Sequence, residues 1–313
     1  DVLGAALMTA GVTMLVLLTT WGGNQYAWTS PVILGLGVVI LLTVAAFIAV
    51  ELRAPEPVIP IRLFRVKAFA VSTTVSLILG VAMFGTLGFL PLFLQVVTGS
   101  SATRSGLALF PMMGGVLVSS ILSGNLISRT GRYKVFPVVG MGIAVVGMGL
   151  LSTIDAGTDR ITVSLFMFVL GAGIGLTMQV MILATQNAVP TSELGSATAA
   201  VTFFREIGGS IGIALFGAVF TSGLTRRLGS GGTPRGGLSL SLIHKLPEPQ
   251  QTKVIVAIAE SIGHIFVFAA PVMFGAFVIT WFIREVPLKQ STHGVVEHGA
   301  TVEVVPEMVE IGT

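Results

Sequence analysis

Two adjacent ionisable residues inside an apolar stretch have the clearest potential for chemistry. Arg205 and Glu206 lie in the stretch 198–220, which holds no other charged residue. Ionisable groups are costly to place inside a membrane, so each one is a functional candidate. A carboxyl group there can bind a proton and release it when water enters the site. The structural alternative is that Arg205 reaches the inner surface or a neighbouring loop, while a cation on another helix keeps Glu206 ionised.

A second set of residues could form the wall of a cavity for large apolar or cationic molecules. Aromatic and Met side chains suit such ligands when a few polar groups accompany them, because they combine apolar surface with cation–π contacts. The alternative for each residue is ordinary helix packing or contact with lipid. The candidates are Phe84, Phe89, Phe93, Gln95, Met178 and Gln179.

The sequence lacks the patterns of the common enzyme and metal sites. Its four histidines, at 244, 264, 293 and 298, show no metal-ligand spacing, and it holds no cysteine. There is no phosphate-binding loop and no Ser/His/Asp arrangement. The glycines of 171–175 have the spacing G-x-G-x-G and follow no strand, so they do not form a dinucleotide site. We therefore expect no enzyme, no cofactor and no metal.

The composition predicts that the candidate residues lie on membrane-spanning helices. Hydrophobic residues make up 53% of the chain and charged residues 10%, whereas a soluble domain carries about 25% charged residues. Backbone polar groups must be satisfied internally in lipid, which favours a helical bundle. The formal net charge of +3 comes from cations near the ends of apolar runs and not from a patch interleaved with aromatics. We therefore expect no nucleic-acid partner.

A short basic stretch, 124–134, separates two apolar runs that are each long enough to cross a bilayer. We expect it to be a tight loop, because its glycines permit a sharp turn. The two flanking helices are then antiparallel neighbours. Its cations indicate the cytoplasmic side by the positive-inside rule. The residues that define it are Gly124, Arg129, Gly131, Arg132 and Lys134.

The order of the apolar runs predicts an all-α polytopic membrane protein with eight transmembrane helices. Short segments expected on the cytoplasmic side carry most of the cations, and the short outer ones hold only Arg104 and Arg160. An exception is the inner segment that contains Glu193, which has no cation. Both ends of the chain are expected in the cytoplasm. The predicted crossings are 2–20, 32–50, 69–97, 105–122, 135–151, 161–183, 198–220 and 265–283.

Three parts of the chain differ in composition. We expect two linking transmembrane helices and a Pro-rich cytoplasmic linker in 1–66, and a six-helix bundle in 67–286. Within the bundle, 222–264 is expected to be a long extracytoplasmic loop. The polar, acidic segment 287–313 is expected to be a disordered cytoplasmic tail. The pairs Gly171/Gly175 and Gly208/Gly212 have the small-xxx-small spacing that predicts close helix contacts.

The loop pattern G-x-L-x-x-R-x-G-R-x-K in 124–134 resembles the signature of the major facilitator superfamily of secondary transporters. With this helix order, the chain resembles the latter part of a fourteen-helix drug:proton antiporter of the EmrB/QacA type. Ser128 departs from the signature, because the family's first-half copy has Asp at that point. Further phrases that carry the resemblance lie at 21–23, 28–31, 60–65, 90–95, 186–190, 204–209 and 284–288.

The resemblance implies a proton-driven exporter of hydrophobic or cationic drug-like compounds in the cytoplasmic membrane, multi-pass in the bilayer. It also implies an N-terminal six-helix bundle that is missing from this chain and would hold most of the family's proton carriers. Transport would then proceed by rocking of two bundles around a central site. The alternatives are a transporter of another metabolite in the same superfamily and a non-catalytic membrane subunit.

Overall fold

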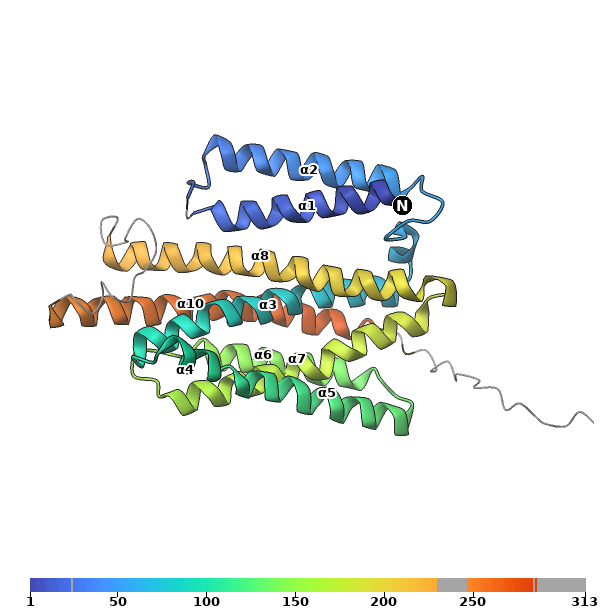
Figure 1. The fold of residues 1–313 in the computed structure, drawn as a ribbon. Helices are drawn as coiled ribbons and strands as arrows, with labels where there is room; N and C mark the ends of the chain where they lie inside the picture. The colour runs from blue at the N-terminus through green and yellow to red at the C-terminus, as the bar shows by residue number, and fades with distance from the viewer. Residues whose placement is uncertain (24, 230–246, 284, 286–313) are drawn as a thin grey trace, which may run out of the picture.

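The apolar runs fold into long helices that pass back and forth along one axis (Figure 1). The computed structural model describes residues 1–23, 25–229, 247–283 and 285. In that part of the chain the helices are α1 (Val2–Trp21), α2 (Pro31–Glu51), η1 (Ile61–Arg65), α3 (Lys67–Val97), α4 (Ala102–Leu107), α5 (Phe110–Thr130), α6 (Val135–Leu151), α7 (Arg160–Ala188), η2 (Thr191–Glu193), α8 (Leu194–Leu228) and α10 (Glu248–Thr280).

Seven helical stretches of the described residues are long and apolar enough to cross a membrane, with α4 and α5 counted as one. The remaining apolar helix, α6, has 17 residues and is slightly shorter than that criterion. The predicted all-α polytopic fold is confirmed. The eight predicted crossings correspond to these seven stretches and α6.

The basic stretch 124–134 is mostly helical, whereas we expected a loop throughout. Helix α5 continues to Thr130, and only 131–134 form the connection to α6. Gly124 has open space around it and remains within the helix. Gly131 ends the helix, because its φ of 68° is in the left-handed region and its N–H donates to the carbonyl of Ile127.

The predicted outer loop, 222–264, is helical at both of its described ends. Helix α8 extends to Leu228 and α10 begins at Glu248. Basic residues in the last turn of α8 and an acid in the first turn of α10 complement the helix dipoles. An ion pair of 2.7 Å between Arg227 and Glu260 joins the two extensions. The rest of that predicted loop, 230–246, and the predicted tail, 287–313, lie outside the described residues.

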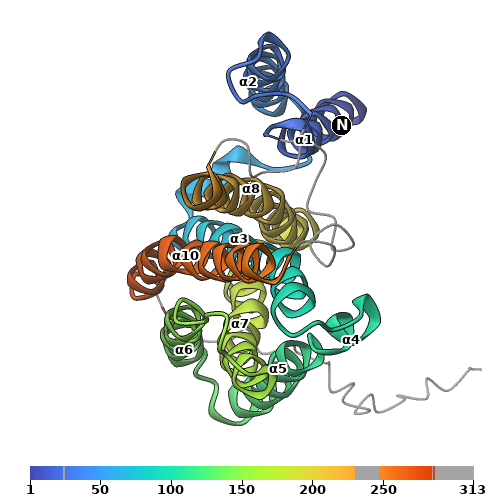
Figure 2. The same ribbon diagram turned by 90° about the vertical axis from the view of Figure 1, so that its left-hand side faces the viewer.

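The helices form three layers, which are seen end-on in Figure 2. The pair α1 and α2 lies on one side, the group α3, α8 and α10 lies in the middle, and the group α5, α6 and α7 lies on the other side. Helix α3 packs most extensively against α8, and α7 packs against both α5 and α6. Contacts of α3 with α7 and of α10 with α6 join the two groups.

Glycines permit the closest helix contacts, as their spacing predicted. A Cβ added at Gly171 would lie 2.1 Å from the carbonyl oxygen of Met112 on α5. One added at Gly208 would lie 1.9 Å from the carbonyl oxygen of Leu77 on α3. A Cβ at Gly212 would meet the α3 backbone in the same way. The predicted contact faces at the two glycine pairs are therefore confirmed.

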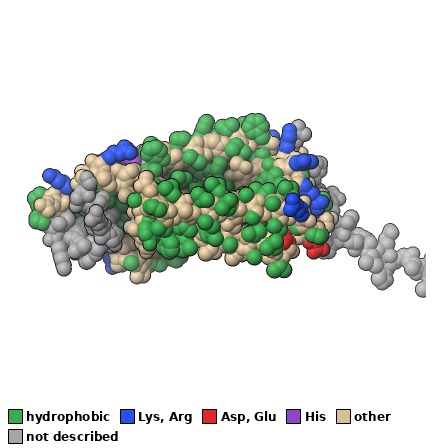
Figure 3. Space-filling model, turned by 90° about the horizontal axis from the view of Figure 1, so that it is seen from above, with side chains coloured by type: hydrophobic (Ala, Val, Ile, Leu, Met, Phe, Trp, Pro, Cys, Tyr) green, Lys and Arg blue, Asp and Glu red, His purple; other side chains and the backbone are tan. Residues whose placement is uncertain are grey.

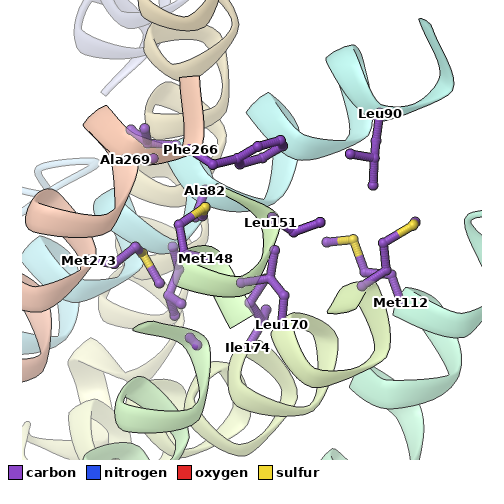
Figure 4. Close-up of a cluster of buried hydrophobic side chains, with 14 of the residues drawn as sticks. Ala82, Leu90, Met112, Met148, Leu151, Leu170, Ile174, Phe266, Ala269 and Met273 are labelled. Carbon is purple, nitrogen blue, oxygen red and sulfur yellow. The ribbon is translucent and has the colours of Figure 1, made fainter. Parts of the chain in front are cut away.

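The main core lies where α3, α5, α6, α7 and α10 meet (Figure 4). Met112, Met148 and Phe266 are fully buried there, next to smaller side chains such as Ala82. Met has three rotatable bonds and fills irregular gaps between helices. This core fixes these five helices relative to one another, and Phe216, Phe220 and Leu224 of α8 also belong to it.

The two ends of the bundle differ in their connections. One end, which we call the linker end, carries the linker 52–66, the corner 131–134, η2 and residue 285. The backbone N–H of Tyr133 donates to Glu285 Oε1 at 3.1 Å, so the corner and the end of α10 lie on the same face. Lys and Arg side chains gather at the two ends, and hydrophobic side chains cover the middle (Figure 3).

Candidate functional site

An open groove of about 720 Å³ lies along the half of α8 nearest the linker end. Three polar residues on α8, Thr198, Thr202 and Glu206, are spaced four apart and therefore share one face of the helix. The groove is hollow beside them because small residues, Gly195 and Ala199, lie on the same side. The full lining is Gln186, Leu194, Gly195, Thr198, Ala199, Thr202, Phe203 and Glu206.

Hydrogen bonds hold in place the end of the groove at the start of α8. Gln186 at the end of α7 donates its side-chain N–H to the Thr198 hydroxyl at 3.0 Å. That hydroxyl donates in turn to the carbonyl of Leu194 at 2.7 Å. The bond from Gln186 therefore connects α7 to the first turns of α8, so the two walls of the groove keep a fixed spacing here.

The predicted pair Arg205 and Glu206 lies at the far end of the groove. The Glu206 side chain is 55% exposed and faces the groove, whereas the Arg205 side chain is only 11% exposed. Their closest charged atoms, Arg205 Nη2 and Glu206 Oε1, are 3.6 Å apart. Among the described residues, Arg205 is the cation that pairs with Glu206. The carboxylate thus faces the opening while the positive charge beside it is buried.

Helix packing fixes the position of Arg205. A Cβ added at Gly80 of α3 would lie 1.9 Å from the Arg205 carbonyl oxygen, so the backbones of α3 and α8 meet at this level. The buried Arg205 Nε has no hydrogen-bond partner among the described residues. A buried charge is costly without a partner of opposite charge. The Glu206 carboxylate is the partner of the buried Arg205 among the described residues.

The six predicted cavity residues do not line this groove. Phe93 is fully buried in the main core. Phe84 packs against Gly209, and Phe89 makes ring contacts with two aromatic residues of α8, at 5.6 and 6.4 Å between centroids. Gln95 and Met178 are half-buried, and Gln179 is exposed on α7. Residue type alone did not show which way these side chains point.

The basic corner holds the predicted loop residues at the linker end. Arg129 is in the last turn of α5 and is exposed, as is Arg132. Lys134 is half-buried at the start of α6. Tyr133 between them is fully buried, which anchors the corner. Gly124 lies within α5, and Gly131 ends it.

Contacts of the linker are the features that sequence reasoning missed. Glu51 at the end of α2 is 4% exposed, and its Oε1 accepts the backbone N–H groups of Val58 and Ile59 at 3.1 and 3.2 Å. Arg62 forms an ion pair with Glu193. The sequence did carry one signal, since the inner segment with Glu193 had an acid and no cation. The linker supplies that cation.

No group of His, Asp or Glu side chains within the described residues could hold a metal ion. The groove instead offers one carboxylate, two hydroxyls, an amide and the apolar ring of Phe203. These groups combine polar and apolar contacts in one open groove, which suits an amphiphilic molecule.

Curated relatives of this chain are named as transporters. An uncharacterized MFS-type transporter of Mycobacterium tuberculosis (strain ATCC 25618 / H37Rv) is 43% identical over 293 residues, which cover 92% of this chain and 43% of that protein. The multidrug transporter protein MdtP of Bacillus subtilis (strain 168) is 37% identical, over 71% of this chain and 41% of that protein. The chain thus spans less than half the length of these two relatives.

A tetracycline resistance determinant of Streptomyces rimosus is 33% identical over 318 residues. The match covers 91% of this chain and 91% of that protein. Among solved structures, a bacterial homolog to the human lysosomal transporter Spinster, inward-facing and occupied, superposes with a TM-score of 0.58. That superposition covers 80% of this chain and 56% of the other, at 15% identity, so the likeness concerns the fold alone.

A family model also matches most of the chain. The model described as Major Facilitator Superfamily matches residues 2–213, which is more than half of the chain. The helical fold and the order of apolar runs agree with that match. This chain belongs to the Major Facilitator Superfamily.

Proposed function

We propose that this chain forms one side of a multidrug efflux transporter that exchanges protons for hydrophobic or cationic compounds. The observation that carries the proposal is the exposed carboxylate of Glu206, which lies on a membrane-spanning helix and faces an open groove. Ionisable groups on membrane-spanning helices are costly, and they mark the pathways of substrates, ions or protons. The names of two relatives, a multidrug transporter protein and a tetracycline resistance determinant, support the choice of substrate.

The groove suggests how exchange works. An organic cation can pair with Glu206 and place its apolar part against Phe203, while the Thr198 and Thr202 hydroxyls bind its polar groups. A proton and a cation compete for the same carboxylate, because protonation removes the charge that attracts the cation. Proton binding from the outer side therefore releases substrate, and proton loss on the inner side restores the site. Arg205 is proposed to hold the carboxylate in place.

A transporter of this kind needs a second wall. We propose that a further six-helix bundle faces the groove, since the chain spans 43% of the length of the first relatives. The linker end is proposed to face the cytoplasm, because its short connections carry Arg53, Arg65 and Arg132. The protein is proposed to reside in the cytoplasmic membrane with both ends inside.

Ethidium transport into inverted membrane vesicles tests the proposal. The natural protein that contains this chain should accumulate ethidium, and a protonophore should abolish accumulation. Glu206→Gln removes the carboxyl group while keeping the shape of the side chain, and should abolish the effect of the proton gradient. Glu56→Gln is the matched control, because Glu56 is an exposed acid of the linker outside the groove.

Two results would reject the proposal. Uptake that is unaffected by collapsing the gradient would refute proton exchange. Absence of uptake for any amphiphilic cation, in a protein that is folded and correctly inserted, would favour transport of another metabolite or a non-transporting role.

A further inference from the structure

The linker between α2 and α3 reaches the groove through a series of aromatic rings. Phe64 of η1 contacts Phe69 at 5.0 Å between ring centroids and Phe204 of α8 at 5.8 Å. Phe204 contacts Phe203 at 6.0 Å. All three contacts are edge-to-face, with interplanar angles of 79–81°, which is a favourable geometry for aromatic pairs. Phe203 lines the groove, so Phe64 lies two ring contacts away from its wall.

Polar contacts hold the linker in position at both sides of η1. On one side, Glu51 accepts two backbone N–H groups, at residues 58 and 59. On the other side, Arg62 pairs with Glu193, just before the first residue of α8. The Arg62 side chain is 72% exposed, whereas that of Glu193 is 11% exposed. Removal of Arg62 would therefore leave a mostly buried carboxylate without its partner.

Apolar contacts hold the linker against the first turns of α8. Ile59 and Leu63 of the linker are 5% and 2% exposed and pack with Ala197 and Ala200 of α8. These residues form a cluster of their own, separate from the main core. The position of the first part of α8 therefore depends on the linker as well as on the bundle.

We propose that residues 58–64 of the linker position the wall of the groove. Phe64 orients Phe203 through Phe204, and Arg62 fixes the start of α8 through Glu193. Neither side chain lines the groove, so both are positioning residues. The consequence for substrate selection rests on the function proposed above, whereas the positioning itself can be tested without transport. A change in the linker should alter the fit of bulky substrates more than the maximal transport rate.

Cysteine labelling measures the groove directly, because this chain contains no cysteine. Thr202→Cys places one thiol in the groove, and its rate of reaction with a maleimide reports how open the wall is. The measurement uses the natural protein in membranes, otherwise free of cysteine. Phe64→Ala removes two ring contacts and should raise the rate about five- to tenfold. Arg62→Ala should raise it about two- to fivefold.

Matched variants separate positioning from general damage. Arg65→Ala removes an exposed cation of the same η1 helix for which the described residues show no ion pair. Phe274→Ala removes a ring that contacts Phe277 on α10, away from the groove. Both should leave the labelling rate unchanged. The double exchange Arg62→Glu with Glu193→Arg should restore the parent rate.

The inference is refuted if Phe64→Ala and Arg62→Ala keep the parent labelling rate in protein that melts at the parent temperature. It is also refuted if the two control variants raise the rate equally. In transport, the linker variants should change KM for bulky cations and leave the maximal rate within about twofold. Altered labelling without gradient-driven transport would retain the positioning role and reject the proposed function. The opposite result would reject the positioning role alone.

Discussion

Replacing Gly80 by Ala should separate α3 from α8 and lower stability. The added Cβ would lie 1.9 Å from the Arg205 carbonyl oxygen, and real Cβ atoms essentially never come closer than 3.0 Å to a neighbour. The two backbones must therefore move apart by about 1 Å, since neither atom belongs to a flexible side chain. Overpacking of this kind costs about 1–3 kcal/mol. The extra helix propensity of Ala offsets about 0.5–1 kcal/mol of that cost.

The matched control is Gly88→Ala on the same helix. Gly88 is exposed and has no atom within 4 Å of an added Cβ, so only the gain in helix propensity applies. The two variants should therefore differ by about 1–3 kcal/mol, because the propensity term is common to both. Thermal unfolding of the purified protein in nanodiscs, followed by intrinsic fluorescence, measures the difference. Equal melting temperatures for the two variants would show that the α3–α8 contact is not as close as the structure describes.

Three further substitutions test the connections of the bundle. Gly131→Ala should cost about 1–2 kcal/mol in thermal unfolding, because only the positive φ opposes the new side chain. Glu285→Ala should speed hydrogen exchange at the Tyr133 amide about tenfold, since the acceptor of that amide is lost. Hydrogen bonds from the hydroxyl and amide of Thr162 hold the pKa of Asp159 below its ordinary value. The stability from this cap should be present above about pH 4 and lost as the pH falls further, and Asp159→Asn should remove that pH dependence.

Hydropathy and glycine spacing were sufficient to predict the fold. Runs of apolar residues gave the crossings, and the Gly208/Gly212 pair gave the face of α8 that meets α3. Hydropathy did not give the ends of the helices. Polar residues continue a helix wherever caps and packing allow it, so α5 extends to Thr130 and α8 to Leu228.

The contacts of the linker were beyond prediction from sequence. Arg62 and Glu193 are far apart in the chain, and nothing local to either residue indicates the other. The predicted cavity residues do not line the groove, and their role in substrate binding stays a prediction. Phe93 and Phe84 are nine residues apart on α3, so they point about 180° apart. Phe93 is fully buried in the core and Phe84 is half-buried. Residue type indicates which ligands a side chain could bind. The packing of the neighbouring helices decides which side chains face a groove.

The direction of the acid–base pair does follow from the phase of α8. Successive residues of a helix point about 100° apart, so Arg205, Gly208 and Gly212 share one face while Glu206 lies on another. Since Gly208 and Gly212 can contact α3 only through that face, Arg205 must be turned toward the bundle. Glu206 then falls on the row of Thr198 and Thr202, which borders the groove. The same glycines that allow close packing thus bury the cation and leave the carboxylate open to the groove.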